Sequence, residues 1–147
     1  MSLKDRLQAE LKDALKSKNK IKLETIRSII NAVKNQEINN KTDLNDEAIE
    51  KIITTLVKQH KDSIEQFKKG GREDLVKKEE QELEILMQFL PEQLSEDEIR
   101  EIVQKTIAEI GASSTKDIGK VMKAVMPKLQ NRAEGKLVNQ IVRESLS

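Results

Sequence analysis

The amino-acid sequence predicts an all-α protein with two helical subdomains, an N-terminal bundle of about four helices and a C-terminal module of three helices. Apolar residues recur at every third or fourth position in seven segments, and only a helix brings such residues onto one face. No alternation of apolar and polar residues with a period of two is long enough for a strand. Pro91 interrupts the helical pattern, so we expect subdomains at residues 1–90 and 91–147.

The first two helices are predicted from two apolar stripes that a polar turn at residues 17–20 separates. Ser2 and Asp5 have the spacing of a capping box at the start of the first helix. Residues 35–40 are polar, and we expect them to form a loop after the second helix. The two stripes consist of aliphatic residues: Leu3, Leu7, Leu11, Ala14 and Leu15, then Leu23, Ile26, Ile29, Ile30 and Val33.

The third helix is expected to be the longest, from about Asp46 to Lys69, because its apolar spacing persists until Gly70-Gly71 supplies a left-handed stop. The fourth helix begins with acidic residues, which favour the positive end of the helix dipole, and ends before Pro91. The middle of this helix, residues 77–82, is wholly polar. We expect that stretch to protrude from the core as a solvated arm.

The C-terminal module is predicted from helix-start signals. Leu94 and Ile99 fit a hydrophobic staple at the start of the first helix of this module, and Gly111 is expected to end that helix. Pro127 is expected to end the second helix. Three helices in roughly 55 residues lie near the lower limit for independent stability. Each start carries a polar pair three residues apart: Ser95 with Glu98, Ser114 with Asp117, and Asn131 with Glu134.

The composition excludes several kinds of catalytic and metal site. A chain without cysteine has no disulfide, thiolate metal ligand or cysteine nucleophile. The single histidine, His60, cannot assemble a multi-histidine zinc site, and we assign it a structural or surface role. The fourth helix carries four acidic residues, which we interpret as a solvated face: Glu79, Glu80, Glu82 and Glu84. We therefore expect no catalytic residue, no cofactor and no metal.

Positive charge is concentrated in residues 115–143, which hold seven basic residues against two acidic ones. Several of the lysines recur at helical spacing, so this segment is a candidate phosphate-facing surface. Exposed lysines at this spacing also serve solubility, and that alternative stays open. Without Tyr, Trp or a clustered pair of Phe residues there is no platform for stacking unpaired bases, so contacts with RNA should read backbone and shape rather than sequence. The basic residues are Lys116, Lys120, Lys123, Lys128, Arg132, Lys136 and Arg143.

The start of the chain, residues 1–6, carries charges where a secretory signal would need an apolar stretch. No apolar run approaches the length that spans a membrane. We therefore expect a cytoplasmic protein with no membrane partner.

Several strings taken together resemble the YqeY family, and the resemblance covers essentially the whole chain. The strings are Leu23-Glu24-Thr25-Ile26-Arg27, Lys61-Asp62-Ser63-Ile64-Glu65-Gln66-Phe67, Phe89-Leu90-Pro91-Glu92-Gln93-Leu94-Ser95, Gly111-Ala112-Ser113-Ser114, Lys116-Asp117-Ile118-Gly119-Lys120-Val121-Met122, Met126-Pro127, and Arg132-Ala133-Glu134-Gly135-Lys136-Leu137-Val138-Asn139.

YqeY-like proteins are similar to the helical tail of GatB, a subunit of the glutamine-dependent amidotransferase that converts mischarged Glu-tRNA or Asp-tRNA to the amide form. The tail helps to hold tRNA, and a similar module assists tRNA binding in some glutaminyl-tRNA synthetases. The tail's motifs match this chain at Gly119, Val121 and Met122 and at Lys136-Leu137-Val138-Asn139. The resemblance therefore adds Gly119 and Asn139 to the candidate tRNA-binding residues. Gly119 permits a close approach by either another helix or a phosphate, and packing is the preferred interpretation.

The resemblance implies a non-catalytic tRNA-binding accessory module. One alternative is participation in carbon-nitrogen ligase activity with glutamine as the amido-N donor, which this chain could support only beside other subunits. Its partners would then include components of an aminoacyl-tRNA synthetase or of the amidotransferase. Another alternative is a helical protein-interaction module that uses the acidic helix within residues 92–109 or the arm at residues 77–82.

Overall fold

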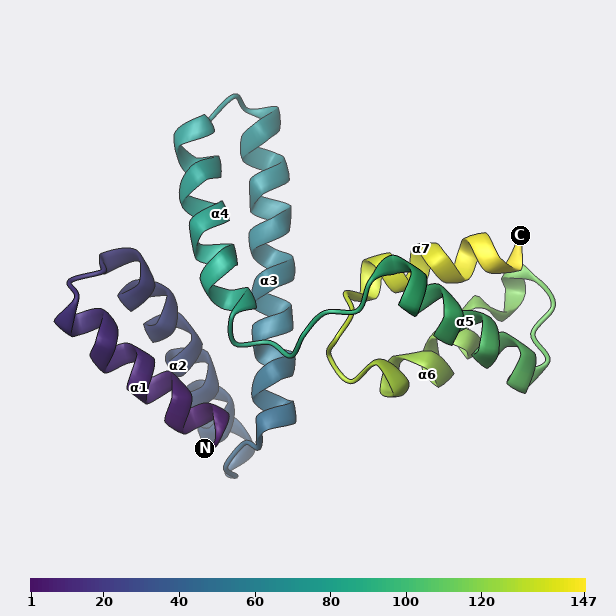
Figure 1. The fold of residues 1–147 in the computed structure, drawn as a ribbon, viewed down its shortest axis with the longest axis horizontal. Coiled ribbons are helices and arrows are strands. Elements are labelled where there is room, and N and C mark those ends of the chain that lie inside the picture. The colour runs from purple at the N-terminus through teal and green to yellow at the C-terminus, as the bar shows by residue number, and fades with distance from the viewer. The chain divides into compact units, whose positions relative to one another are not determined.

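A computed structural model describes residues Met1–Ser147 and shows seven α-helices, one short 3-10 helix and no strand. The predicted all-α class is confirmed. The chain divides into two compact units, Met1–Leu90 and Pro91–Ser147, which we call the first and the second unit (Figure 1). Each unit has its own cluster of buried apolar residues. No helix is both long and apolar enough to cross a membrane.

The first unit consists of two helical hairpins around one core. Helix α1 packs against α2, α3 pairs with α4 along its length, and α2 also contacts α3 and α4. The outer part of the α3–α4 hairpin extends beyond α1 and α2 (Figure 1). Ile26, Ile29, Ile53 and Leu86 are fully buried where these helices meet. The helices are α1 (Leu3–Lys16), α2 (Lys20–Asn40), α3 (Asp46–Lys69) and α4 (Glu73–Met87).

The start of α1 and the end of α3 confirm two sequence predictions. The Ser2 hydroxyl accepts a hydrogen bond from the Asp5 N–H at 3.1 Å, and the Asp5 carboxylate accepts the Ser2 N–H, which completes the capping box. Helix α3 ends at Lys69, and Gly71 has a left-handed φ of 68°. Leu15 was predicted to belong to the apolar stripe of the first helix, but half of its surface is exposed, so this prediction is wrong.

The loop predicted at residues 35–40 is wrong, because α2 remains helical through Asn40. Glu37 holds this last turn in place. Its carboxylate accepts the Leu44 N–H at 2.9 Å and pairs with the Lys4 ammonium of α1. The Lys4 ammonium, helped by the Leu44 N–H, keeps the pKa of Glu37 below its usual range. The helix then stops at Lys41, which adopts a left-handed conformation.

The solvated arm predicted at residues 77–82 also needs correction. This polar stretch lies within α4, and α4 packs along α3. Glu79 and Glu82 are half-buried because they face His60 of α3, while the other residues of the stretch 77–82 are exposed. The polar middle of α4 therefore forms part of a helix-helix contact.

The second unit is a bundle in which α5, α6 and α7 each contact the other two. Its core includes the fully buried Ile99, Val103, Val121 and Ile141. The predicted capping box between Ser95 and Glu98 is present at the start of α5. The predicted stop at Gly111 is confirmed by its left-handed φ of 69°. The elements are α5 (Glu96–Ile110), a 3-10 turn η1 (Thr115–Asp117), α6 (Ile118–Leu129) and α7 (Gly135–Leu146).

Two helix boundaries in the second unit differ from prediction. Pro127 lies inside α6, which continues to Leu129. Pro127 lacks the N–H for one helical hydrogen bond, but Leu129 is buried in the core, and this burial favours the extra residues of the helix. Asn131 does not cap α7, because it has a left-handed φ of 64° and belongs to the turn; α7 begins after Glu134.

Candidate nucleic-acid interface

All nine candidate tRNA-binding residues lie in the second unit. The 3-10 turn η1 and α6 carry five of them, the turn after α6 carries one, and α7 carries three. Seven are exposed, while Arg132 and Asn139 are half-buried. In chain order they are Lys116, Gly119, Lys120, Lys123, Lys128, Arg132, Lys136, Asn139 and Arg143.

The outer face of α6 is set by the residues that the helix buries. Val121, Val125 and Leu129 recur every four residues and face the core, so Gly119, Lys120 and Lys123 lie on the other side and are exposed. Lys116 precedes them in η1 and is also exposed. We call Lys116, Gly119, Lys120 and Lys123 the α6 lysine patch. The three ammonium groups of this patch, and that of Lys136 on α7, have no hydrogen-bond or ion-pair partner in the chain.

Lys128 differs from the lysines of the patch because it is engaged with α5. Its ammonium donates to the Thr106 hydroxyl oxygen at 3.0 Å and to the Glu109 carboxylate at 2.7 Å. The same contact holds the pKa of Glu109 below its usual range. Thr106 is fully buried, and its own hydroxyl donates to the Ile102 carbonyl at 2.8 Å. Lys128 therefore joins α5 to α6.

Arg132 and Arg143 also have partners within the unit. The Arg132 side chain donates to the Glu92 carbonyl at 2.9 Å, and its own carbonyl accepts the Leu94 N–H at 2.8 Å. These bonds tie the segment before α5 to the turn after α6. Arg143 donates to the Asn139 side-chain oxygen at 2.7 Å, one helical turn away on α7. The structure therefore leaves Lys116, Lys120, Lys123 and Lys136 as the candidate cations without a partner.

Gly119 does not serve helix packing within this chain, which corrects the preferred interpretation of its role. A β-carbon built on Gly119 would meet no atom within 4 Å, and the residue is exposed. Its backbone is helical without a positive φ, so no turn requires glycine there. A helical glycine costs about 0.5–1 kcal/mol relative to alanine. The backbone of α6 is therefore exposed at Gly119, and the lysines of the patch precede and follow it in the chain.

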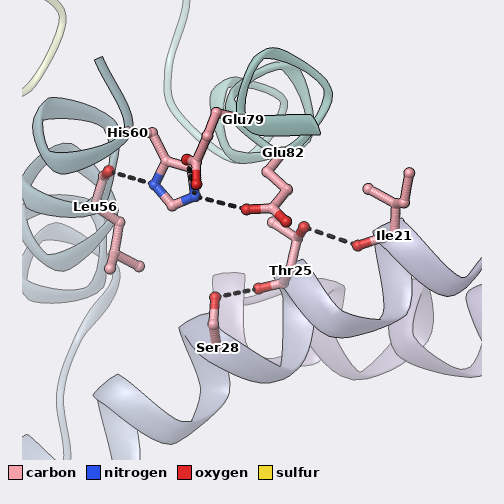
Figure 2. Close-up of polar contacts among 7 residues, drawn as sticks. All are labelled: Ile21, Thr25, Ser28, Leu56, His60, Glu79 and Glu82. Carbon is pink, nitrogen blue, oxygen red and sulfur yellow. Dashed lines mark hydrogen bonds and ion pairs between the residues drawn. The ribbon is translucent and has the colours of Figure 1, made fainter. Parts of the chain in front are cut away.

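A second polar cluster was not predicted from the sequence. His60 of α3 meets Glu79 and Glu82 of α4 in the first unit (Figure 2). The two glutamates are three residues apart on one helix, and this spacing alone predicts that they lie side by side on its surface. The histidine is distant in sequence, and only the pairing of α3 with α4 brings it to them.

Comparison with curated proteins finds fungal relatives named "Altered inheritance of mitochondria protein 41, mitochondrial". The protein from Pyrenophora tritici-repentis is 35% identical over 142 residues, which is 95% of this chain and 78% of the relative. The one from Lachancea thermotolerans is 37% identical over 111 residues, 74% of this chain and 59% of the relative. The one from Saccharomyces cerevisiae is 38% identical over 85 residues, 57% of this chain and 46% of the relative. The chain thus spans about half of the length of several relatives that it matches.

These names overturn the expectation of a cytoplasmic protein, because the relatives are named as mitochondrial. The expectation rested on the absence of an apolar secretory stretch at residues 1–6. Mitochondrial transit peptides are amphipathic and rich in arginine, so a test for an apolar stretch says nothing about them. The cytoplasmic expectation was wrong for this reason.

A family model described as "Yqey-like protein" matches residues 4–146. The match includes both units and all nine candidate residues. It confirms the resemblance that the sequence strings indicated, and the chain belongs to the YqeY-like protein family.

Proposed function

We propose that this chain is a non-catalytic accessory module that holds tRNA through the α6 lysine patch and Lys136. The observation that carries the proposal is an exposed glycine in a helix, Gly119, with unpaired lysines before and after it in the chain. Membership of the YqeY-like family supports a helical module similar to the tail of GatB.

The chemistry of the patch suits a polyanion. Ammonium groups bind phosphate oxygens by charge and hydrogen bonding, and neutralising phosphates releases counterions from the nucleic acid. A glycine on the exposed face lets a sugar-phosphate chain approach the helix backbone more closely than any side chain would permit. Double-stranded RNA is recognised largely through such contacts to shape and backbone. The patch would therefore hold folded RNA without reading its sequence.

The test is the affinity for tRNA, measured by fluorescence anisotropy at several salt concentrations. Bulk tRNA and mitochondrial tRNA are both used as probes, because the curated relatives are named as mitochondrial. With four phosphate contacts, the logarithm of the association constant should fall with the logarithm of the salt concentration with a slope of about −3. Absence of binding at about 50 mM salt, where such contacts are strongest, would contradict the proposal.

Replacing Gly119 with alanine is expected to stabilise the free protein while weakening its binding of tRNA. The methyl group meets nothing in the chain, so the free energy of unfolding should rise by about 0.5–1 kcal/mol. The same methyl group would separate a phosphate from the helix backbone, and we expect about a fivefold loss of affinity, roughly 1 kcal/mol. Urea denaturation and anisotropy measure the two effects.

Gly135→Ala is the matched control for this substitution. Gly135 opens α7, and a β-carbon there would lie 4.0 Å from the Met126 methyl group, an ordinary contact. We expect unchanged affinity for tRNA in this variant. Equal affinity of Gly119→Ala and the unsubstituted protein would remove Gly119 from the proposed interface.

The two alternative functions stay predictions and have distinct tests. Incubating the pure chain with glutamine, ATP and mischarged tRNA tests carbon-nitrogen ligase activity, and product formation would contradict a purely accessory role. A protein-interaction module would capture synthetase or amidotransferase components in a pull-down that nuclease treatment does not change. Loss of the captured proteins after nuclease treatment would instead favour the RNA-mediated role.

A further inference from the structure

The α3–α4 hairpin brings one imidazole and two carboxylates together. The Nε2 atom of His60 lies 3.0 Å from Oε2 of Glu82 and 3.5 Å from Oε2 of Glu79. These potential ligand atoms all lie within 4.8 Å of one another. The three side chains are only 18% to 23% exposed. Figure 2 shows the imidazole between the backbone of α3 and the two glutamates of α4.

The hydrogen bonds around His60 fix the form of its ring. Its Nδ1 atom lies 2.8 Å from the Leu56 carbonyl oxygen, which only accepts hydrogen bonds, so Nδ1 carries a hydrogen and donates it. In the neutral ring, Nε2 then presents a lone pair toward the two glutamates. Ionised carboxylates are also acceptors only. Three acceptors that converge at these distances need a cation among them.

The hydroxyl that Figure 2 draws next to this cluster does not supply the missing donor. Thr25 of α2 is buried, and its single hydroxyl hydrogen is donated to the Ile21 carbonyl at 2.8 Å. The cation is therefore either a second proton on the imidazole or a metal ion. The two cases differ in whether Nε2 is a donor or a ligand.

We propose that His60, Glu79 and Glu82 bind one divalent transition-metal ion of the Zn²⁺ class, which clips α3 to α4. Zinc lies about 2.0–2.2 Å from nitrogen and oxygen ligands, so neighbouring ligands in a tetrahedral site are about 3.3–3.6 Å apart. The observed 3.5 Å distance lies within this range, and the observed 3.0 Å distance lies just below it. One imidazole with two carboxylates is a mixed ligand set that zinc accepts.

The surroundings of His60 also fit a metal ligand. A metal-binding histidine usually donates its other ring N–H to a carbonyl or carboxylate, and the Leu56 carbonyl occupies that place. The partial exposure of the three side chains leaves access for water as a fourth ligand. The sequence-based expectation of no metal considered a zinc site with several histidines, which a single histidine cannot form. The proposed site needs only one histidine, because two carboxylates supply the other protein ligands. Because α3 and α4 carry the ligands, binding would stabilise the hairpin.

The test is zinc binding to the full chain, measured with zinc chloride by isothermal titration calorimetry at one neutral pH. The chain has one histidine and no cysteine, so no other imidazole or thiolate competes for the ion. We expect one Zn²⁺ per chain and a higher melting temperature with zinc. Losing an outer partner of a metal ligand costs about tenfold in affinity or more, so removing a direct ligand in His60→Gln, Glu79→Gln or Glu82→Gln should cost at least that.

Glu84→Gln is the matched control. It makes the same charge change on the same helix, at an exposed residue outside the cluster, and should leave zinc affinity within about twofold. Circular dichroism of each variant without zinc shows whether it folds. Folded Glu79→Gln and Glu82→Gln variants that bind zinc as tightly as the unsubstituted chain would overturn the proposal.

The nitrogen resonances of His60 give a readout that does not depend on the variants. Because His60 is the only histidine, a long-range ¹H–¹⁵N spectrum reports on it alone. We expect zinc to shift the Nε2 resonance while Nδ1 keeps its hydrogen. A spectrum of a doubly protonated ring that zinc leaves unchanged would overturn the proposal and identify the cluster as an ion pair.

Discussion

Replacing Ile141 with alanine is expected to unfold the second unit while the first unit stays folded. Ile141 is fully buried in the core that α5, α6 and α7 share. Removing a large aliphatic side chain from such a site costs about 2–5 kcal/mol. A single hydrophobic core in a unit of 57 residues rarely supplies more than about 3–5 kcal/mol, so this loss removes much or all of the unit's stability. The first unit has a separate core and keeps its packing.

Hydrogen exchange followed by mass spectrometry measures this effect separately in the two units. Peptides from α5 to α7 should lose their protection, and those from α1 to α4 should keep theirs. Ile110→Ala is the matched control, because Ile110 lies on α5 with 43% of its surface exposed and its loss should cost less than about 0.5 kcal/mol. Loss of protection throughout the chain would show instead that the two units unfold together.

The features that the sequence predicted well are those that depend on a few neighbouring residues. A capping box joins positions three residues apart, so Ser2 and Ser95 marked helix starts without knowledge of the rest of the chain. Gly71 and Gly111 adopt the left-handed conformation that ends a helix, which glycine permits at little cost. Helical periodicity likewise identified the elements because it is a local repeat.

The boundaries that the sequence did not predict depend on distant contacts. The last turns of α2 are held by Glu37, whose partners Lys4 and Leu44 lie on another helix and in a loop. The turn after Pro127 ends at Leu129, which is buried in the core of the second unit. Polar composition and a proline are weak signals when a tertiary contact favours the helix.

The candidate interface was predicted as a set of residue types, and the structure separates that set by what each side chain contacts. Lys123 and Lys128 look alike in the sequence, yet only Lys128 is engaged, because Thr106 and Glu109 of α5 reach it. The absence of any atom within 4 Å of a β-carbon at Gly119 also depends on the packing of the whole unit. The concentration of basic residues in one segment of the sequence therefore identified the candidates, and only packing showed which of them have no partner.

Neutralising the four candidate lysines that have no partner is expected to lower tRNA affinity by about two to three orders of magnitude at physiological salt. The variant carries glutamine at each position, which retains most of the side-chain length and removes the charge. Each lost phosphate contact removes one released counterion, so the salt slope should approach zero from about −3. Anisotropy titrations at several salt concentrations measure both quantities. The substitutions are Lys116→Gln, Lys120→Gln, Lys123→Gln and Lys136→Gln.

A second fourfold variant controls for net charge. It neutralises four exposed lysines elsewhere, on α1, α3 and α5, so the two variants have the same net charge. The control substitutions are Lys12→Gln, Lys16→Gln, Lys58→Gln and Lys105→Gln. A local interface predicts that the control keeps most of the affinity and a slope near −3, because the lysines that it neutralises are outside the α6 lysine patch. Equal losses in both variants would show that overall charge attracts the RNA, and would contradict a binding site on the α6 lysine patch.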